Sequence, residues 1–156
     1  MRILLVDPYL SDSECQTLGV EKVSLEEAFS QAFIVSNHVP DNEETRDMIG
    51  AEHFRLLPQG GAFINTGRGR TLRNEEFIQT FQERPDLTAL LDVTHPEPLA
   101  SDSPLWDMPN IHVSSHIAGA IGAETRRMAD LCLDELERWL KGEPLQHLVE
   151  PGALKL

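Results

Sequence analysis

NTGRG at residues 65–69, DVTHPEP at residues 92–98 and SSHIAG at residues 114–119 are the stretches that decide the fold of this chain. Each comes after a short apolar run, so Arg68, Glu97 and His116 all lie just past the end of an expected strand. In an open α/β sheet, ligands bind at the carboxyl ends of the strands. The shared position of these side chains therefore predicts one site at one edge of a parallel sheet.

The three side chains suit proton transfer on a small acid. An Arg can clamp a carboxylate through two parallel hydrogen bonds, and the glycines beside Arg68 let a ligand or the backbone approach closely. A His passes protons near neutral pH, and a Glu can orient that His and raise its pKa. Plainer interpretations are a turn Arg on a surface carboxylate, an exposed loop Glu and a hydrogen-bonded structural His. Arg70 and Arg73 are alternatives for the carboxylate.

The composition predicts one packed domain in a reducing compartment, with a cytoplasmic location. Of the 156 residues, 40% are hydrophobic, and the net charge is −13. This charge argues against binding to nucleic acid or anionic membranes, which need basic patches. Cys15 and Cys132 have no metal-type spacing, and core packing is expected for Cys132 on an apolar helical face. No secretory leader or membrane span is expected, because the apolar start at Ile3–Val6 is short.

Apolar runs alternate with helical patterns along the chain. The pattern predicts strands over Arg2–Asp7, Phe33–Val39, Gly61–Asn65, Thr88–Val93 and Ile111–Ser115. It predicts helices over Ser24–Gln31, Asp41–Leu57, Asn74–Arg84 and Ala123–Lys141, the first two with a capping-box Glu. The Pro-rich connection 94–110 has no clear helix or strand, and loops of this length are often functional. The expected fold class is α/β, with a parallel sheet covered on both faces.

Two further features have competing interpretations. Asp7 ends the first expected strand, where an acidic residue in a dinucleotide fold binds ribose hydroxyls, although an Asp after a strand often only forms a turn. His112 and His116 are four residues apart, which on a helix would suit a metal. The segment is expected to be a strand, where such residues lie about 13 Å apart, so no metal is predicted.

The three motifs occur in the order typical of the D-isomer-specific 2-hydroxyacid dehydrogenases, which the chain resembles over residues 1–143. Further matches are Asp-Pro-Tyr at 7–9, His-Val-Pro at 38–40 and Asp-Ser-Pro-Leu-Trp at 102–106. The resemblance implies an incomplete doubly wound, Rossmann-like sheet with a long C-terminal helix. It divides the chain into a partial dinucleotide-binding domain at 1–120, a helix returning toward the substrate domain at 121–143 and a tail at 144–156.

The resemblance also assigns roles by position, with NAD as the cofactor and a small 2-keto or 2-hydroxy acid as the substrate. Arg68 would bind the substrate carboxylate and polarise the 2-carbonyl, while His116, paired with Glu97, would move the proton. Asp7 would hold the adenosine ribose, and Asp92 would face the nicotinamide carboxamide. The other implied NAD-site residues are Val39, Thr66, Gly67 and Ala118. A homodimer is implied as well, because the nucleotide domain commonly forms the dimer interface in this family.

The chain departs from the family because these residues include neither the N-terminal substrate-domain segment nor the first strand with its G-x-G-x-x-G turn. The expectation is an N-terminally truncated form that is weak or inactive alone: a shortened gene product, a misassigned start, or a half that needs a second chain. The alternative is a catalytically inactive dimerisation or interaction module. Smaller departures, Phe33 for Asp, Gly67 for Ala and Ser114-Ser115 for Thr-Pro, indicate a subfamily variant.

Overall fold

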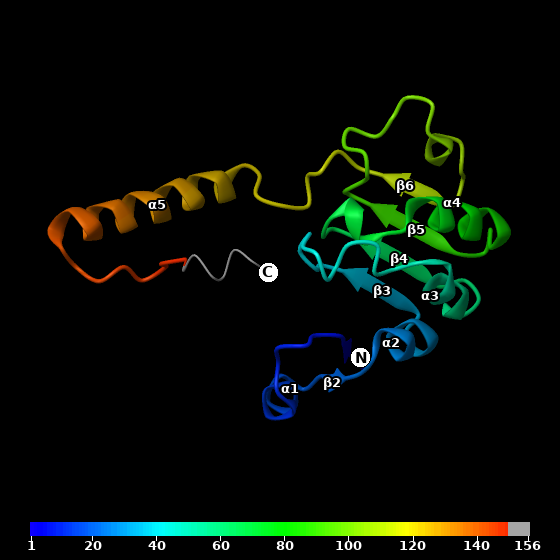
Figure 1. The fold of residues 1–156 in the computed structure, drawn as a ribbon, viewed down its shortest axis with the longest axis horizontal. Coiled ribbons are helices and arrows are strands. Elements are labelled where there is room, and N and C mark those ends of the chain that lie inside the picture. The colour runs from blue at the N-terminus through cyan, green and yellow to red at the C-terminus, as the bar shows by residue number, and fades with distance from the viewer. Residues whose placement is uncertain (150–156) are drawn as a thin grey trace. The chain divides into compact units, whose positions relative to one another are not determined.

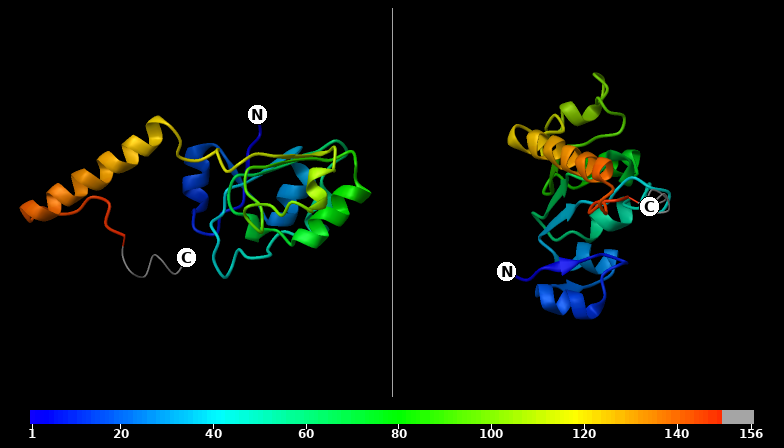
Figure 2. Two further views of the ribbon diagram at one scale, coloured as in Figure 1. Left: turned by 90° about the horizontal axis from the view of Figure 1, so that it is seen from above. Right: turned by 90° about the vertical axis from the view of Figure 1, so that its left-hand side faces the viewer.

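The computed structural model describes residues 1–149, which form one compact unit over Met1–Ser114 and a second that begins at Ser115. The second unit contains α5 (Ala123–Lys141), a single continuous helix in Figure 2. The elements of the first unit (Figure 1) are, in chain order, β1 (Leu4–Leu5), α1 (Asp12–Leu18), β2 (Glu21–Lys22), α2 (Leu25–Gln31), β3 (Ile34–Asn37), α3 (Ala51–Leu56), β4 (Ala62–Asn65), the 3₁₀ turn η1 (Gly69–Thr71), α4 (Asn74–Glu83), β5 (Thr88–Leu91), η2 (Pro104–Trp106) and β6 (Ile111–Val113).

All strand pairs are parallel, as the alternation of apolar runs and helical patterns predicted. β1 pairs with β2, and a larger sheet has the order β3-β4-β5-β6. The register aligns Asn37, Asn65 and Leu91, the last residues of β3, β4 and β5. The loops that follow these strands therefore start from the same edge of the sheet. The fold is α/β and Rossmann-like with a long C-terminal helix, which confirms the expected class.

Helix ends follow local signals in the sequence. The Ser24 hydroxyl accepts the Glu27 N–H at 3.1 Å, and the Glu27 carboxylate accepts the Ser24 N–H at 2.9 Å, which is the predicted capping box of α2. α5 has the predicted bounds, and the residue that follows it, Gly142, is its C-cap, with a φ of 70° in the left-handed region. These ends need no long-range contact, so the sequence pattern predicts them well.

The helix predicted over Asp41–Leu57 is wrong in its first part, where the chain forms turns before α3 begins. The Asn42 side chain accepts two following backbone N–H groups, both at 2.9 Å, and this closes a turn. Asp47 has a φ of 54°, outside helical space, and Ile49 then pairs with Leu72 in a parallel bridge. The tertiary bridge to the segment before α4 therefore overrides the local helical pattern.

α1 and β2 were not anticipated, and β1 is shorter than the strand expected over Arg2–Asp7. The signal for α1 was present, because Ser11 and Glu14 form a capping box like that of α2. Cys15 of this helix is buried, at 3% exposure. The core packing expected for Cys132 is wrong, because Cys132 on α5 is exposed, and the buried cysteine is Cys15.

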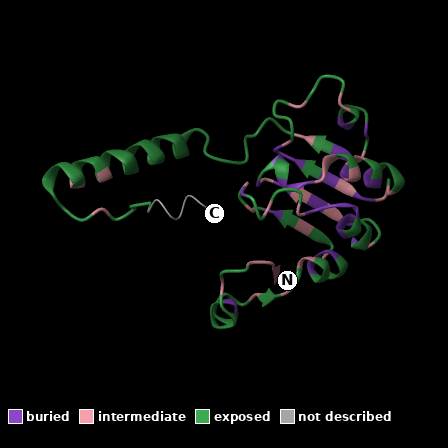
Figure 3. Cartoon of the chain, viewed as in Figure 1, coloured by how far each residue is buried: buried purple, intermediate pink, exposed green. Residues whose placement is uncertain are grey.

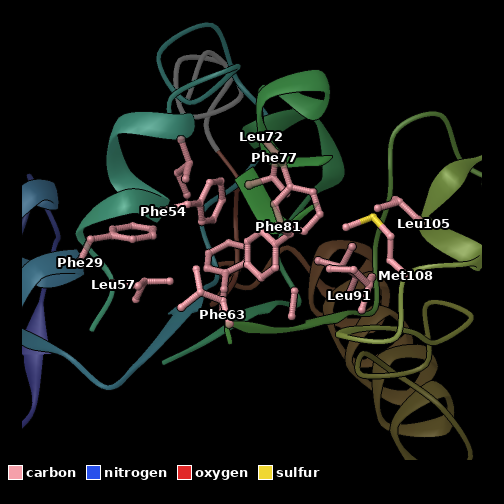
Figure 4. Close-up of a cluster of buried hydrophobic side chains, with 14 residues drawn as sticks. Phe29, Phe54, Leu57, Phe63, Leu72, Phe77, Phe81, Leu91, Leu105 and Met108 are labelled. Carbon is pink, nitrogen blue, oxygen red and sulfur yellow. The ribbon is translucent and has the colours of Figure 1, made fainter. Parts of the chain in front are cut away.

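The core of the first unit is a cluster of phenylalanines between the larger sheet and its helices (Figure 4). The ring centroid of Phe63, on β4, lies 6.0 Å from that of Phe29 on α2 and 5.1 Å from that of Phe54 on α3. Phe77 and Phe81 on α4 place their ring centroids 5.2 and 5.5 Å from that of Phe54. All five side chains are fully buried, so α2, α3 and α4 are fixed against one face of the sheet.

The other face of the larger sheet is open in the first unit, although helices were expected on both faces. Ile34 and Leu90 on this face are 57% and 42% exposed (Figure 3). This face mixes polar and apolar side chains, because Ser36 and His112 lie in the same register row as Leu90. A sheet can face water on one side, and the mainly apolar strand sequences did not indicate this.

The second unit presents α5 with every side chain at least partly exposed in the described part of the chain (Figure 3). Of the tail expected over 144–156, residues 144–149 form no helix or strand, and residues 150–156 lie outside the described residues. None of the helices within residues 1–149 combines the length and the apolar composition that crossing a bilayer requires.

Replacing Phe54 by Ala should lower the free energy of unfolding by about 3–5 kcal/mol. The ring contacts four other phenylalanines, so its removal would leave a cavity in the core. Urea unfolding followed by circular dichroism measures the loss. The matched control is Phe33→Ala, at a ring that is 59% exposed, which should cost less than about 1 kcal/mol. Equal losses in the two variants would contradict the assigned core.

Candidate active site

The carboxyl edge of the larger sheet brings together the loops predicted to carry the site. Thr66, Asp92 and Ser114 each follow a strand directly. Their backbone N–H groups donate to the last carbonyl of the neighbouring strand, which belongs to Asn37, Asn65 and Leu91 respectively, at 3.2, 2.9 and 2.9 Å. The ladder thus continues one residue beyond each strand and fixes where each loop begins. The predicted site residues along this edge are Val39, Thr66, Gly67, Arg68 and Asp92.

Gly67 and Gly69 pack the Arg68 loop against its two neighbours. A Cβ at Gly67 would lie 2.8 Å from the Val39 carbonyl oxygen, past the end of β3. A Cβ at Gly69 would lie 2.1 Å from the Thr94 carbonyl oxygen, past the end of β5. The loop that carries Arg68 is therefore packed closely between two other loops, as the flanking glycines indicated. Its side chain is exposed, and its Nη1 donates to the Gly67 carbonyl at 2.7 Å.

The Glu97 loop is held near its start by two hydrogen bonds. Asn74, the first residue of α4, donates from Nδ2 to the His95 carbonyl at 3.2 Å. The Thr94 hydroxyl donates to the Pro96 carbonyl at 2.9 Å. Glu97 itself has an exposed side chain. The segment leading to Glu97 is thus tied to α4 and to its own backbone.

Charges from three loops act together around Asp41. Arg46 Nε donates to the Asp41 carboxylate at 2.8 Å, and this bond holds the pKa of Asp41 below its ordinary value. The positive charges of Arg70 and His95 lower the pKa of Asp41 further. The loops after β3, β4 and β5 therefore share one electrostatic environment.

Two carboxylates were predicted to serve NAD. Asp92 is 6% exposed, and its Oδ1 accepts the Ser114 hydroxyl at 2.5 Å. Asp7 is partly buried after β1, and its Oδ1 accepts the N–H groups of Tyr9 and Leu10 at 2.7 and 3.1 Å. The turn-forming interpretation of Asp7 is therefore confirmed, while its contact with a ribose stays a prediction.

His116 and Ala118 belong to the second unit. His116 has a φ of 55°, in the left-handed region that few residues other than glycine adopt. Strained backbone of this kind clusters at functional sites. The convergence of His116 with Arg68 and Glu97, and the role of Ala118, stay predictions.

The segment before His116 is a strand, as expected. β6 includes His112, which lies in register with Leu90 on the open face of the sheet. His112 and His116 therefore do not share the face of one helix. Among residues 1–149, no group of three or more His, Cys, Asp or Glu side chains is placed to hold a metal.

Polar residues beneath the site were missed from the sequence. Asn37, Asn65 and Thr71 are buried and hydrogen-bonded to one another. His38 Nδ1 lies 2.9 Å from the Thr66 hydroxyl. A signal was present, because the strands IVSN and AFIN both end in Asn where a buried strand otherwise has an apolar residue.

Comparison with known families resolves what kind of domain this is. The sequence model described as "D-isomer specific 2-hydroxyacid dehydrogenase, NAD binding domain" matches residues 1–118. The chain belongs to this family. The matched part is the NAD-binding domain, which confirms the cofactor that the resemblance implied.

Individual relatives agree with this membership. The chain is 33% identical over 156 residues to a glyoxylate reductase of Korarchaeum cryptofilum, covering 100% of this chain and 47% of the relative. It is 38% identical over 117 residues to glyoxylate/hydroxypyruvate reductase B of Cronobacter sakazakii, covering 75% of this chain and 36% of the relative. The chain therefore spans less than half the length of these curated relatives.

Solved structures support the same fold. Apo D-mandelate dehydrogenase of Rhodotorula graminis matches with a TM-score of 0.84 and 30% identity, covering 96% of this chain and 44% of that chain. A D-isomer specific 2-hydroxyacid dehydrogenase of Xanthobacter autotrophicus, in complex with NADPH and MES, matches with a TM-score of 0.77 and 29% identity, covering 97% and 61%.

The carboxyl edge fits part of a dinucleotide. It offers a buried carboxylate at Asp92 and a hydroxyl at Thr66, and Asp7 adds a second carboxylate after β1 of the smaller sheet; such groups bind amides and ribose hydroxyls. The 156 residues hold no G-x-G-x-x-G turn, whose N–H groups would cradle a pyrophosphate. The chemistry of these groups therefore suits an amide and ribose hydroxyls.

Replacing Gly69 by Ala should destabilise the domain by about 1–3 kcal/mol, because the new Cβ would overlap the Thr94 carbonyl and push two loops apart. Thermal unfolding measures the effect. Arg70→Ala, at an exposed side chain one position further along, is the control and should change stability by less than about 0.5 kcal/mol. A Gly69→Ala variant as stable as the control would contradict the tight loop packing.

Proposed function

We propose that this domain serves an NAD-dependent oxidoreductase that interconverts a 2-keto acid and a D-2-hydroxy acid by hydride transfer. The observation that carries the proposal is the close packing of the Gly67 to Gly69 loop, which carries Arg68, against the two loops beside it. This loop lies at the carboxyl edge that also holds buried Asp92. The substrate class is supported by relatives named as reductases of glyoxylate and hydroxypyruvate.

The chain's own residues divide the work on the substrate. Arg68 binds the carboxylate and polarises the 2-carbonyl, because its planar fork of donors stabilises negative charge as it develops on oxygen. His116 gives a proton to the carbonyl oxygen during reduction and takes the hydroxyl proton during oxidation. Glu97 pairs with His116 and orients its ring for the transfer. Bound NADH supplies the hydride.

The remaining proposed residues hold the cofactor. Asp7 accepts hydrogen bonds from the adenosine ribose, and Asp92 accepts one from the nicotinamide carboxamide. The residues that line the rest of the NAD site are Val39, Thr66, Gly67 and Ala118. In this proposal residues 1–120 form a partial dinucleotide-binding domain, and the helix at 121–143 returns toward a substrate domain.

The test is a chimaera that joins these 156 residues to the remaining part of the Korarchaeum glyoxylate reductase, assayed by NADH absorbance with glyoxylate and hydroxypyruvate. His116→Asn should lower kcat by about 10²–10⁴-fold, because a general acid–base group is lost. Arg68→Lys should lower kcat/KM by about 10²-fold, because a point charge cannot replace a bidentate clamp. The 156 residues alone should turn over little, because they lack the pyrophosphate-binding turn.

The matched control for that test is Arg70→Lys in the same chimaera, which should keep the parent activity. Full activity after His116→Asn would refute the acid–base assignment. Comparable turnover by the 156 residues alone would refute the need for a Gly-rich turn.

NAD should bind at least about tenfold more tightly than NADP, because the Asp7 carboxylate favours free ribose hydroxyls and repels a 2′-phosphate. Competitive titration of the chimaera with both cofactors measures the ratio. Asp7→Asn removes the charge and should narrow the gap. A preference for NADP in the parent chimaera would mean that Asp7 does not meet the ribose.

We also propose that the protein acts as a cytoplasmic homodimer. Support comes from α5, where Leu136, Trp139 and Leu140 are 49%, 66% and 70% exposed. Contiguous apolar side chains of this kind mark association surfaces. The same surface supports the second candidate function, a non-catalytic interaction module.

Replacing Leu136 and Leu140 by Glu should raise the dimer dissociation constant at least about tenfold, because each buried Leu contributes about 1.5–3 kcal/mol to an interface. Sedimentation equilibrium measures the constant. Glu137→Gln, a polar substitution on the same helix, should leave it unchanged. A monomeric parent chain would refute the dimer.

A further inference from the structure

Three buried polar side chains lie beneath the Arg68 loop. Asn37, Asn65 and Thr71 are 5%, 0% and 0% exposed, against the phenylalanine core. Asn37 and Asn65 are register partners at the ends of β3 and β4, and Thr71 ends the 3₁₀ turn that follows Arg68. Burying a polar group costs free energy unless it is hydrogen-bonded, so each side chain needs partners.

The side chains satisfy one another first. Asn37 Nδ2 donates to Asn65 Oδ1 at 3.0 Å and to Thr71 Oγ1 at 2.9 Å. The two Asn37 amide protons are thereby used inside the group. We call Asn37, Asn65 and Thr71 the buried triad. Hydrogen bonds linked in this way polarise and strengthen one another in a low-dielectric interior.

The remaining bonds of the buried triad go to the backbone of the site. The Arg68 carbonyl accepts the Thr71 hydroxyl at 2.7 Å and Asn65 Nδ2 at 3.2 Å. Asn65 Oδ1 accepts the Gly67 N–H at 3.1 Å, and Asn37 Oδ1 accepts the Val39 N–H at 3.3 Å. The backbone of three proposed site residues, on two different loops, is thus tied to one interior group.

We infer that the buried triad is a positioning device that sets the Arg68 loop, and with it the direction of the carboxylate clamp. Three residues of the chain act through Arg68 and need no contact with substrate. The inference about the clamp rests on the proposed function of Arg68, whereas the inference about loop position rests on the hydrogen bonds alone.

The need to hold the Arg68 loop in one position explains the buried triad better than a gain in folding stability does. Replacing a bonded buried pair by apolar groups of the same shape is often close to neutral for stability. The helix-covered face of the sheet elsewhere carries apolar residues such as Phe63 and Ala89. The polar side chains of the buried triad lie where the backbone of a loop is held by hydrogen bonds, which is a task that an apolar contact cannot perform.

The first test measures loop position by amide hydrogen exchange in the 156-residue chain. Thr71→Val keeps the shape and removes the hydroxyl, so the Gly67 amide should exchange about five- to tenfold faster, with a smaller rise at Val39. Thr71→Ser keeps the hydroxyl and should restore slow exchange. Thr71→Ala, which cannot overpack, is measured alongside Thr71→Val.

The matched control is Thr80→Val. Thr80 is also 0% exposed, and its hydroxyl donates to the Glu76 carbonyl at 2.7 Å within α4, away from the loop. This variant carries the general cost of losing one buried hydrogen bond. If exchange at Gly67 rises no more in Thr71→Val than in Thr80→Val, the positioning role is overturned.

The second test measures how tightly Arg68 binds a carboxylate. Pyruvate is the probe, and its binding is followed at the Arg68 Nε–H resonance. Acetone is the analogue that lacks a carboxylate. Thr71→Val should weaken pyruvate binding about five- to tenfold, and Thr80→Val should leave it unchanged. Unchanged binding in a Thr71→Val chain with a loosened loop would overturn control of the clamp. If the Arg68 resonance of the wild-type chain does not shift when pyruvate is added, the proposed function of Arg68 is refuted. The exchange rates of the first test still decide the inference about loop position.

Discussion

The parallel register that sets Asn37, Asn65 and Leu91 side by side is the constraint on which the rest of this structure depends. Because the strands end together, the loops that follow begin together. The loops then approach so closely that a single Cβ at Gly67 or Gly69 would overlap a neighbouring carbonyl. Arg68 has little freedom of backbone position as a result. The start of a long flexible side chain is fixed because its loop is packed between two others.

The interior divides its work between apolar and polar groups. The phenylalanine cluster holds α2, α3 and α4 on one face of the sheet. The buried triad lies at the carboxyl end of that core and holds loop backbone at defined positions. Apolar packing has no direction of its own, whereas a hydrogen bond has a donor, an acceptor and an angle. A loop whose backbone has to keep one position needs the second kind of contact directly beneath it.

The surfaces left uncovered agree with a domain that works as part of a larger assembly. Ile34 and Leu90 are exposed apolar side chains on one face of the sheet in the described part of the first unit, and α5 carries an apolar row in the second. The relatives matched by the chain are more than twice its aligned length. These observations support the proposals in which the activity and the dimer involve more surface than the core described here provides.

The sequence by itself determined the α/β class, the parallel sheet, the bounds of α2, α4 and α5, and the family. These follow from local signals: apolar runs, capping residues such as Ser24, a terminal Gly142, and motifs in a fixed order. The loops that carry Arg68 and Asp92 were also correctly placed, because a residue after a parallel strand has only one edge to occupy.

Only the tertiary structure decided three other matters. The helical pattern over 41–57 gave way to turns because Ile49 pairs with Leu72, a partner distant in sequence. One face of the sheet in the first unit stayed open because α2, α3 and α4 pack against the other face, and the face that a helix covers depends on contacts distant in sequence. The Asn at the end of β3 and of β4 was a local sign, but the buried triad could not be inferred as a group because Asn37, Asn65 and Thr71 become neighbours only when β3, β4 and the turn after Arg68 are packed together. A hydrogen-bond partner that is many residues away leaves only a weak local pattern, so only the packed fold showed which residues hold the loop that carries Arg68.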